Sequence, residues 1–383
     1  MQKVVIVMPA WNEAESIKKM IDTLFDTEFP KINAEMHLLV VDNKSTDGMT
    51  DIVQKESKKR KNLHIVQQGN KKGLGNAYVV GMHYAIDTLG ADAILEMDAD
   101  GQHPAECVRP MVNAFLDGAD YAIGARYIPG GSVPKEWALS RRAVSFFGNL
   151  FIRIVLLKPS LHDLTTGFRL SRVKGVLDKI DLDNLMELER FAYKVDLLYQ
   201  CVKNSKNTVE VPLQFKPRTT DKSKFNPKEM LSTFKVAIIL GIKDKQKLIK
   251  FGVVGFAGFI VNFVFLRVFR GMGLAETLVW AFSTELAILN NYIFNNMWTF
   301  RSEKISGLGR HVAKFLQFNL TSAGALIIQS IFGPLGVKLI GEKYDFLVLA
   351  VVIAVLVLPY NYFTYNAVIW KSWDLKKMFG KKK

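Results

Sequence analysis

Short apolar runs alternate with helical patterns along the first third of the chain. Val4–Met8 is apolar at every position, which is typical of a strand buried on both faces of a parallel sheet. Similar runs predict strands at 38–41, 63–67, 93–97 and 121–124, and the patterns between them predict helices at 14–25, 50–59, 75–88 and 107–116. This alternation predicts an α/β domain in which helices cover a mostly parallel sheet.

Four long apolar stretches occupy the last third of the chain, at residues 248–269, 274–294, 312–340 and 346–369. A helix needs about 20 apolar residues to cross a bilayer, so the stretches predict four membrane-spanning helices. Gly333-Pro334 interrupts the third of them. Asn291-Tyr292 in the second recurs as Asn361-Tyr362 in the fourth, which indicates two related helical hairpins.

Two shorter apolar segments, 143–157 and 227–242, lie between these regions and are too short to span a membrane. The first fits either an ordinary core helix or an interfacial helix anchored by Arg141, Arg142 and Lys158. For the second we favour the membrane surface, because a predicted span follows at once. The expected domains are therefore a cytosolic α/β domain at 1–225, an interfacial helix and linker at 226–247, and a four-helix transmembrane domain at 248–383.

The formal net charge of +15 is at first sight typical of a nucleic-acid-binding protein. Many of the basic residues, however, flank the apolar stretches, where positive charge marks the cytoplasmic ends of spanning helices. The flanking residues are Lys243, Lys245, Lys247, Lys250, Arg301, Lys304, Arg310, Lys314, Lys371, Lys376, Lys377 and Lys381 to Lys383. The pattern predicts an integral membrane protein that does not bind nucleic acid, with both termini and the α/β domain in the cytoplasm.

Asp98 and Asp100 follow the predicted strand at 93–97 and are separated by one residue. Open α/β sheets bind ligands at the carboxyl ends of their strands, and carboxylate oxygens suit Mg²⁺ or Mn²⁺. Asp and Gly are equally typical of turns, so the pair alone is a weak signal. The other predicted strands also end in polar clusters, and one shared site is expected from Asn12-Glu13, Asp42-Asn43, Gly69-Asn70, Asp98–Gln102 and Arg126.

Six motifs carry a resemblance to a known family: Pro9-Ala10-Trp11-Asn12-Glu13, Val40-Val41-Asp42, Ser45-Thr46-Asp47-Gly48, Lys72-Gly73-Leu74-Gly75-Asn76-Ala77, Asp98 to Pro104, and Gly124-Ala125-Arg126-Tyr127. In this order and spacing they resemble family 2 glycosyltransferases of the GT-A fold. Within that family the set is most similar to dolichyl-phosphate mannose synthases and related polyprenyl-phosphate glycosyltransferases. Residues 248–370 resemble the GtrA-like membrane domain that some of these synthases carry.

The resemblance implies a binding site for a nucleotide-sugar donor. It assigns the nucleoside to Pro9, Asn12, Glu13 and Asp42, and a metal ion with the donor diphosphate to Asp98, Asp100 and Gln102. Asn12-Glu13 also fits a helix cap. Lys72 and the glycines after it fit either a turn or a nucleotide contact. Asn43 departs from the second acidic residue that the family often has after the equivalent of Asp42.

The resemblance also implies an acceptor site for the phosphate of a lipid carrier, at Arg126, Arg141 and Ser145. The spacing of Arg141 and Ser145 places them on one helix face, and the planar fork of arginine suits phosphate. A snorkelling role for Arg141 at the membrane surface is the alternative. Two further segments match family signatures: Asp163 to Phe168, and a loop with Arg218 and Lys224 in which Asp221 replaces the family's glycine.

The expected activity is inverting transfer of mannose from GDP-mannose to dolichyl or another polyprenyl phosphate in the lipid bilayer, with Mg²⁺ or Mn²⁺ as cofactor. Asp100, Arg126 and Arg141 are the expected catalytic residues. An acceptor phosphate is already anionic and needs no general base, which fits a chain without an evident catalytic His or Cys beside the Asp pair. Two alternatives remain: a glucosyltransferase that uses UDP-glucose, and a lipid-linked sugar flippase or scaffold with a non-catalytic soluble half.

Overall fold

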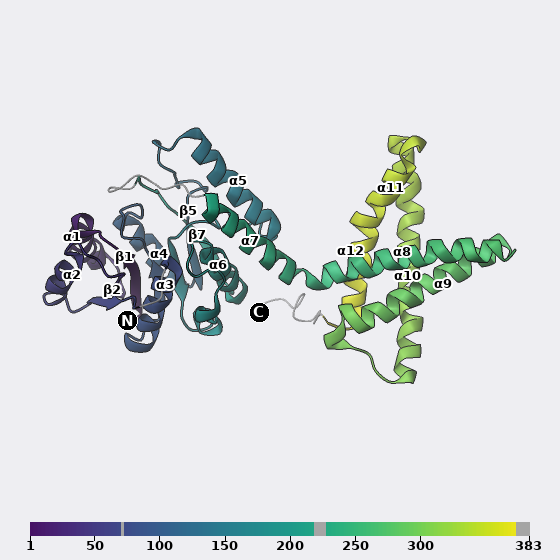
Figure 1. The fold of residues 1–383 in the computed structure, drawn as a ribbon, viewed down its shortest axis with the longest axis horizontal. Coiled ribbons are helices and arrows are strands. Elements are labelled where there is room, and N and C mark those ends of the chain that lie inside the picture. The colour runs from purple at the N-terminus through teal and green to yellow at the C-terminus, as the bar shows by residue number, and fades with distance from the viewer. Residues whose placement is uncertain (70–72, 218–226, 373–383) are drawn as a thin grey trace. The chain divides into compact units, whose positions relative to one another are not determined.

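The computed structural model describes residues 1–69, 73–217 and 227–372, and the chain divides into two compact units, Met1–Gly241 and Ile242–Lys383 (Figure 1). The first is an α/β unit and the second is a helical unit. The finer division into 1–225, 226–247 and 248–383 stays a prediction.

A seven-stranded sheet forms the centre of the α/β unit, in the order β3-β2-β1-β4-β6-β5-β7. All neighbouring strands run parallel except β6, which is antiparallel to both β4 and β5. The predicted mostly parallel sheet is thus confirmed, and it contains two strands that the hydrophobic pattern did not indicate, the inserted strand β6 and the edge strand β7. The strands are β1 (Lys3–Ala10), β2 (Glu35–Asp42), β3 (Leu63–Gln67), β4 (Ala93–Glu96), β5 (Tyr121–Ala125), β6 (Arg169–Arg172) and β7 (Thr208–Pro212).

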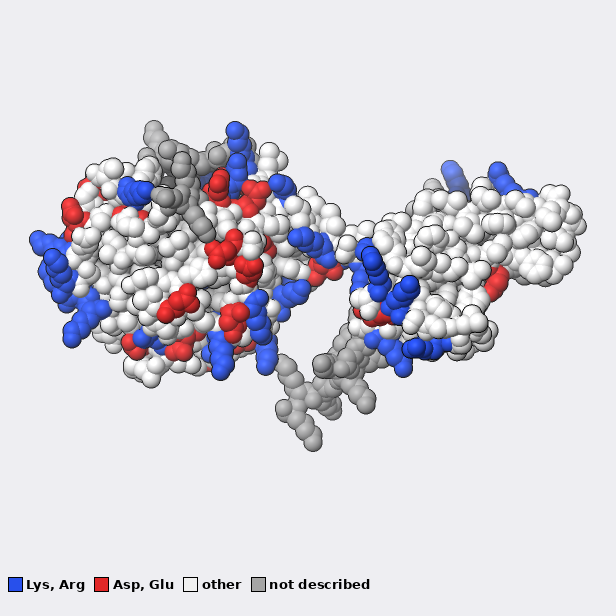
Figure 2. All heavy atoms as spheres, turned by 60° about the horizontal axis from the view of Figure 1, so that its bottom comes forward, with Lys and Arg blue, Asp and Glu red and all other residues white. Residues whose placement is uncertain are grey.

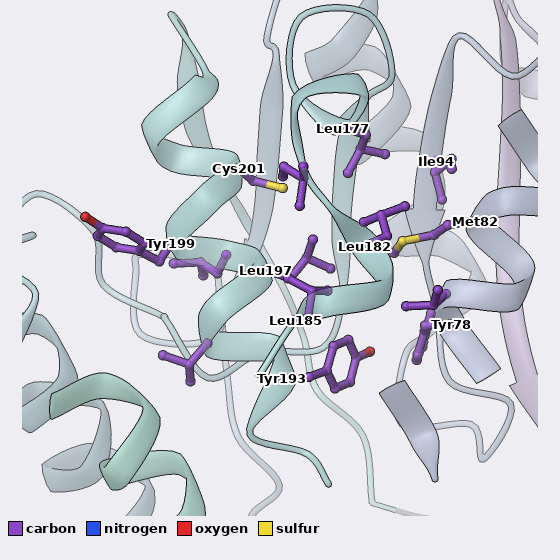
Figure 3. Close-up of a cluster of buried hydrophobic side chains, with 14 of the residues drawn as sticks. Tyr78, Met82, Ile94, Leu177, Leu182, Leu185, Tyr193, Leu197, Tyr199 and Cys201 are labelled. Carbon is purple, nitrogen blue, oxygen red and sulfur yellow. The ribbon is translucent and has the colours of Figure 1, made fainter. Parts of the chain in front are cut away.

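Helices cover both faces of this sheet, which explains why β1 is apolar from Val4 to Ala10. Successive side chains of a strand point to opposite faces. Val5 and Val7 accordingly belong to one buried cluster, and Val4, Ile6 and Met8 to the other. Part of the first cluster is shown in Figure 3, where Tyr193 and Leu197 lie opposite Tyr78 and Met82. The helices are α1 (Ala14–Asp22), α2 (Met49–Ser57), α3 (Leu74–His83), α4 (Val108–Leu116), α5 (Leu139–Val155), α6 (Tyr193–Asn204) and α7 (Pro227–Asp244).

Helices α5 and α7 lie side by side and leave apolar side chains exposed (Figure 1). The rings of Phe151 and Phe234 join them, with centroids 4.8 Å apart. Phe146, Phe147 and Ile154 of α5 stay exposed, so α5 is not an ordinary core helix. The exposed apolar residues of α7 are Leu231, Ile238 and Ile242, whereas Val236, Ala237 and Leu240 pack into the core.

Four helical stretches make up the described part of the helical unit: α8 (Gln246–Gly271), α9 (Glu276–Phe294), α10 (Leu308–Ile340), and a run from α11 (Asp345–Val352) through α12 (Leu358–Thr364) to Ile369. The third stretch forms one helix, because α10 continues through Gly333-Pro334 and ends at Ile340. Within the described residues, α8 is the one helix whose length and apolar character suffice to cross a membrane. The full count of four spans stays a prediction. On the face shown in Figure 2, most of this unit's surface is uncharged, whereas charged side chains are scattered over the α/β unit.

The two helical hairpins end alike. A π-helical segment begins at Asn295, four residues after Asn291, and another begins at Tyr365, four residues after Asn361. Asn296 and Asn366 are both buried in these segments. The recurrence of the Asn-Tyr pair in the sequence therefore corresponds to a recurrence of local backbone structure.

Candidate functional site

A cleft of about 1070 Å³ opens where β1, β2 and β4 end. This volume is at the upper end of the roughly 300–1,000 Å³ that is common for small-molecule sites. The predicted residues Pro9, Asn12, Glu13, Asp98, Asp100 and Gln102 all line it, together with Trp11, Asn43, Asp47, Gln68, Gly73, Leu74 and Phe191 among others. The structure thus brings the predicted donor residues from two separate strand ends into one cavity.

Asn12 is held in a left-handed conformation, with φ 55°, between the ends of β1 and β2. Its backbone N–H donates to Ser45 Oγ (3.0 Å), and its Oδ1 accepts from the Thr46 N–H (2.9 Å). The N–H of Ala14, at the start of α1, is bound by Asp47 Oδ2 (2.8 Å). Glu13 occupies the N-cap position of this helix, and the side chain that binds the first helical N–H is that of Asp47.

Asp42 lies beneath the cleft and is fully buried. Its Oδ1 accepts from the backbone N–H and the hydroxyl of Ser45, and its Oδ2 accepts from Thr50 and Gln67. Burial raises the pKa of this carboxyl, but the hydrogen bonds outweigh that effect and lower it below its ordinary value. In this arrangement Asp42 fixes the loop of Ser45, and a direct contact with a nucleoside requires one of these bonds to open.

The Gly73 position is explained by a close approach of two backbone segments. Gly73 has φ +97°, and a Cβ there would lie 2.4 Å from the Cα of Glu189. The next glycine, Gly75, leaves room for the Leu188 carbonyl, which accepts from the Asn76 N–H (3.2 Å). The glycine motif thus packs the start of α3 onto the segment before α6, while Lys72 lies outside the described residues.

Asp98 is held in place by three groups at the end of β4. Tyr78 Oη donates to its Oδ1 (2.6 Å), Lys194 Nζ lies 3.5 Å from the same oxygen, and the Asp98 N–H donates to Nδ1 of the buried His103 (2.9 Å). Burial raises the pKa of Asp98, but the charge of Lys194 and the hydrogen bond from Tyr78 outweigh that effect and lower it to about 2. The carboxylate is therefore ionised at neutral pH.

The oxygen atoms of Asp98, Asp100 and Gln102 fit a hard divalent cation. In the part of the chain that the structure describes, no three His, Cys, Asp or Glu side chains gather as a preformed metal site. Mg²⁺ is commonly held by one or two carboxylates together with substrate phosphates. The donor set thus fits an ion that is bound jointly with a phosphate-bearing ligand.

Arg126 follows β5 and is buried against Asp163. Its Nε donates to Asp163 Oδ2 (2.7 Å), and its Nη2 donates to Asp163 Oδ1 (2.9 Å) and to Thr165 Oγ1 (2.7 Å). Burial alone raises the pKa of Asp163, but the charge and hydrogen bonds of Arg126 lower it. The sequence analysis identified Arg126 and Asp163 in two separate motifs. The structure shows that their side chains form an ion pair.

An aromatic cluster connects the predicted acceptor residues. The Arg126 guanidinium lies 5.4 Å from the centre of the Phe215 ring, and Phe215 contacts Trp137, whose ring centre lies 3.9 Å from the Arg141 guanidinium. Ser145 Oγ is hydrogen-bonded to the hydroxyl of Tyr127 (2.5 Å). Arg141 and Ser145 share helix α5, as their spacing predicted.

This cluster adjoins the cleft through His103 and the segment after β7. The His103 ring packs against Phe215, with centroids 5.6 Å apart, and the Lys216 N–H donates to the Gln102 carbonyl (3.1 Å). The residues predicted for the two halves of the site are therefore neighbours in space. Arg218 and Lys224, also predicted for the site, lie outside the described residues.

Sequence reasoning missed Tyr78 and Lys194, which both contact Asp98. Tyr78 sits on an apolar helix face and resembles an ordinary core residue. Lys194 carried the better signal, because it stands between aromatic and apolar neighbours in Phe191 to Leu198, where a charge needs a partner. The fold identifies that partner as Asp98.

Comparisons with known proteins agree with this architecture. Residues 5–178 match the family model of glycosyl transferase family 2, and residues 250–370 match that of the GtrA/DPMS transmembrane domain. A dolichol-phosphate mannosyltransferase of Pyrococcus furiosus is 29% identical over 332 residues, which cover 86% of this chain and 89% of that protein.

Two further relatives have a higher identity over shorter alignments, of 240 and 224 residues. A polyprenol monophosphomannose synthase of Mycolicibacterium smegmatis is 33% identical, over 62% of this chain and 86% of its own length. An undecaprenyl-phosphate mannosyltransferase of Micrococcus luteus is 34% identical, over 58% of this chain and 88% of its own length. The chain therefore belongs to glycosyl transferase family 2, and it carries a GtrA/DPMS transmembrane domain after the family 2 domain.

Proposed function

We propose that this protein transfers mannose from GDP-mannose to dolichyl or another polyprenyl phosphate, with inversion at the anomeric carbon. One observation supports this most: the cleft that holds Asp98 and Asp100 adjoins the buried Arg126 through His103 and Phe215. An anion-binding arginine thus lies beside a cation-binding pair of carboxylates. The names of the relatives supply the sugar and the lipid class.

On the donor side, Asp98, Asp100 and Gln102 would hold Mg²⁺ or Mn²⁺ together with the diphosphate. Such an ion would supply positive charge that stabilises the departing nucleoside diphosphate. Pro9, Asn12 and Glu13 line the nucleoside end of the cleft. Asp42 shapes that end from below by fixing Ser45.

On the acceptor side, Arg126, Arg141 and Ser145 bind the lipid phosphate. One phosphate oxygen attacks the anomeric carbon, a new carbon–oxygen bond forms there, and the bond to the diphosphate oxygen breaks. Because the attacking oxygen is already anionic, no proton has to be removed. Catalysis then comes from holding the two anionic substrates in line and from stabilising the charge that develops on the leaving group.

Helices α5 and α7 form the proposed membrane-facing surface of the α/β unit. Their exposed apolar side chains fit a helix pair that lies in the membrane interface, with Arg142 and Lys158 as basic anchors. A lipid phosphate in the bilayer then reaches Arg141 and Ser145 from the same helix that contacts the membrane. We assign the α/β unit and both termini to the cytoplasmic side, and the helical unit to a membrane anchor of four spans.

The test is a transfer assay with purified, detergent-solubilised protein, dolichyl phosphate, Mg²⁺ or Mn²⁺, and labelled GDP-mannose or UDP-glucose in parallel. Label extracted into organic solvent from GDP-mannose supports the proposal. Label from UDP-glucose alone keeps the reaction and changes the sugar. No lipid-linked label from either donor contradicts the proposal and favours a binding or flipping role for the chain.

A further inference from the structure

Lys194 is a buried cation at the back of the cleft. Its side chain is 0% exposed, and its Nζ lies 3.5 Å from Asp98 Oδ1. Among the described residues, no group accepts a hydrogen bond from this Nζ. An ammonium group taken out of water is costly unless opposite charge compensates it. Lys194 therefore needs an explanation beyond packing.

The surroundings of Lys194 stabilise its charge on several sides. The Nζ lies 4.7 Å from the centre of the Tyr78 ring and 5.4 Å from that of Phe191, distances at which an aromatic ring attracts a cation. Phe191 also lines the cleft. Behind Asp98, the buried Glu96 interacts with both Lys194 and Arg169. Two carboxylates and two cations thus share this interior, and only Asp98 of the four lines the cleft.

Gly167 shows that the close approach of Lys194 is built into the chain. A Cβ at Gly167 would lie 2.3 Å from Lys194 Nζ and 3.4 Å from Asp98 Oδ2. Any larger residue would therefore displace the lysine. Gly167 belongs to the same loop as Asp163 and Thr165, which hold Arg126. Lys194 thus lies between the carboxylate of the cleft and the loop that positions the buried arginine.

We propose that Lys194 is the internal counter-ion of Asp98: a positioning residue that weakens divalent-metal binding and strengthens metal-free binding of the donor's diphosphate. The proposal rests on the donor role given above to Asp98. The two effects have opposite signs for a simple reason, since a fixed positive charge repels a metal cation and attracts a diphosphate anion. A lysine that served only to pack the core would change both affinities in the same direction or leave both unchanged.

The experiment uses the full-length protein in detergent, with Lys194→Met to remove the charge at similar size. Mn²⁺ affinity is measured by electron paramagnetic resonance, and affinity for GDP and UDP without metal is measured by calorimetry. Lys203→Met, at an exposed position of the same helix, is the matched control. We expect Lys194→Met to bind Mn²⁺ about tenfold more tightly and the metal-free nucleotide about tenfold more weakly, which corresponds to ~1.4 kcal/mol in each case. We expect Lys203→Met to bind Mn²⁺ and the metal-free nucleotides with the same affinities as the unchanged protein.

Unchanged affinities, or a loss of both together, would overturn the proposal. If the unchanged protein binds neither nucleotide, the proposed donor is wrong, and the Mn²⁺ measurement alone decides on Lys194. If Lys194→Met alone does not fold, a second test compares melting temperatures. Asp98→Asn removes the counter-ion that lies 3.5 Å from Lys194 and should lower the melting temperature, and adding Lys194→Met to it should restore the melting temperature. Failure of that restoration also contradicts the pairing.

Discussion

The carboxylate of Asp163 binds the guanidinium of Arg126 through both of its oxygens, at 2.7 and 2.9 Å, in the interior of the α/β unit. This bidentate geometry fixes the plane of the guanidinium, and Thr165 extends the contact. The loop of Asp163 therefore determines how Arg126 is presented to an acceptor phosphate.

Asp163→Asn should destabilise the protein and abolish most transfer. Loss of the carboxylate leaves a buried arginine charge without a counter-ion, which costs about 3–5 kcal/mol. Glu106→Gln, which opens the exposed pair between Glu106 and Lys216, should cost at most about 1 kcal/mol. Thermal unfolding of both variants in detergent measures their stabilities, and a transfer assay measures their activities. If the two substitutions destabilise the protein equally, the stabilising role of the buried Asp163–Arg126 pair is refuted.

The same pair should make stability depend on pH in the acid range. Arg126 lowers the pKa of Asp163 in the folded protein, whereas the unfolded chain has a pKa of about 3.9. The unfolded state therefore takes up the proton first as pH falls. The stabilisation is complete above about pH 5 and is lost as pH falls through the unfolded-state and then the folded-state pKa. The melting-temperature difference between the unchanged protein and Asp163→Asn should accordingly narrow from pH 5 downward, and a constant difference would contradict the assignment.

Asp100→Asn should reduce the turnover number by about 100-fold or more, because one oxygen ligand of the proposed metal site loses its charge. Asp117→Asn, at an exposed position after α4, should leave the rate unchanged. Rates are compared at saturating GDP-mannose over a range of Mn²⁺ concentrations. A normal rate for Asp100→Asn at every Mn²⁺ concentration would remove this residue from the catalytic site.

Gly73→Ala should raise the KM for the donor and lower stability. The new Cβ would meet the backbone of Glu189, and the residue would have to keep φ +97°. Gly90→Ala is the control, because Gly90 also has positive φ but nothing lies within 4 Å of its Cβ position. Strain alone costs about 1 kcal/mol. A larger loss at Gly73 than at Gly90, measured by thermal unfolding, isolates the contribution of the close approach.

Phe147→Asp should separate membrane contact from chemistry. Phe147 is 63% exposed on α5, and a carboxylate there is disfavoured in the membrane interface. We expect a higher KM for a long-chain polyprenyl phosphate in vesicles and an unchanged KM for a short, water-soluble acceptor. If Phe147→Asp changes the KM for both acceptors by the same factor, or changes neither, the result would contradict the interfacial position of α5.

The hydrophobic pattern predicted the elements that are long, apolar or bounded by turns, such as β1, β3 and α4. It did not predict β6, because Arg169-Leu170-Ser171-Arg172 is short and polar, and its burial depends on strands far away in the sequence. The motifs likewise identified which residues gather at the cleft. They could not show that Asp42 is saturated by hydrogen bonds, that Asp47 binds the first N–H of α1, or that Lys194 reaches Asp98, since each of these depends on a contact between distant segments.

The place of β6 in the sheet has a consequence for synthesis of the protein on the ribosome. β6 lies between β4 and β5, so a nascent chain must extend past Arg172 before these two strands are joined. Until then the edge of β4 remains open to pairing with other chains. All strands of the sheet are synthesised before α8, and translation that stops between β5 and β6 should leave an aggregation-prone fragment rather than a smaller folded domain.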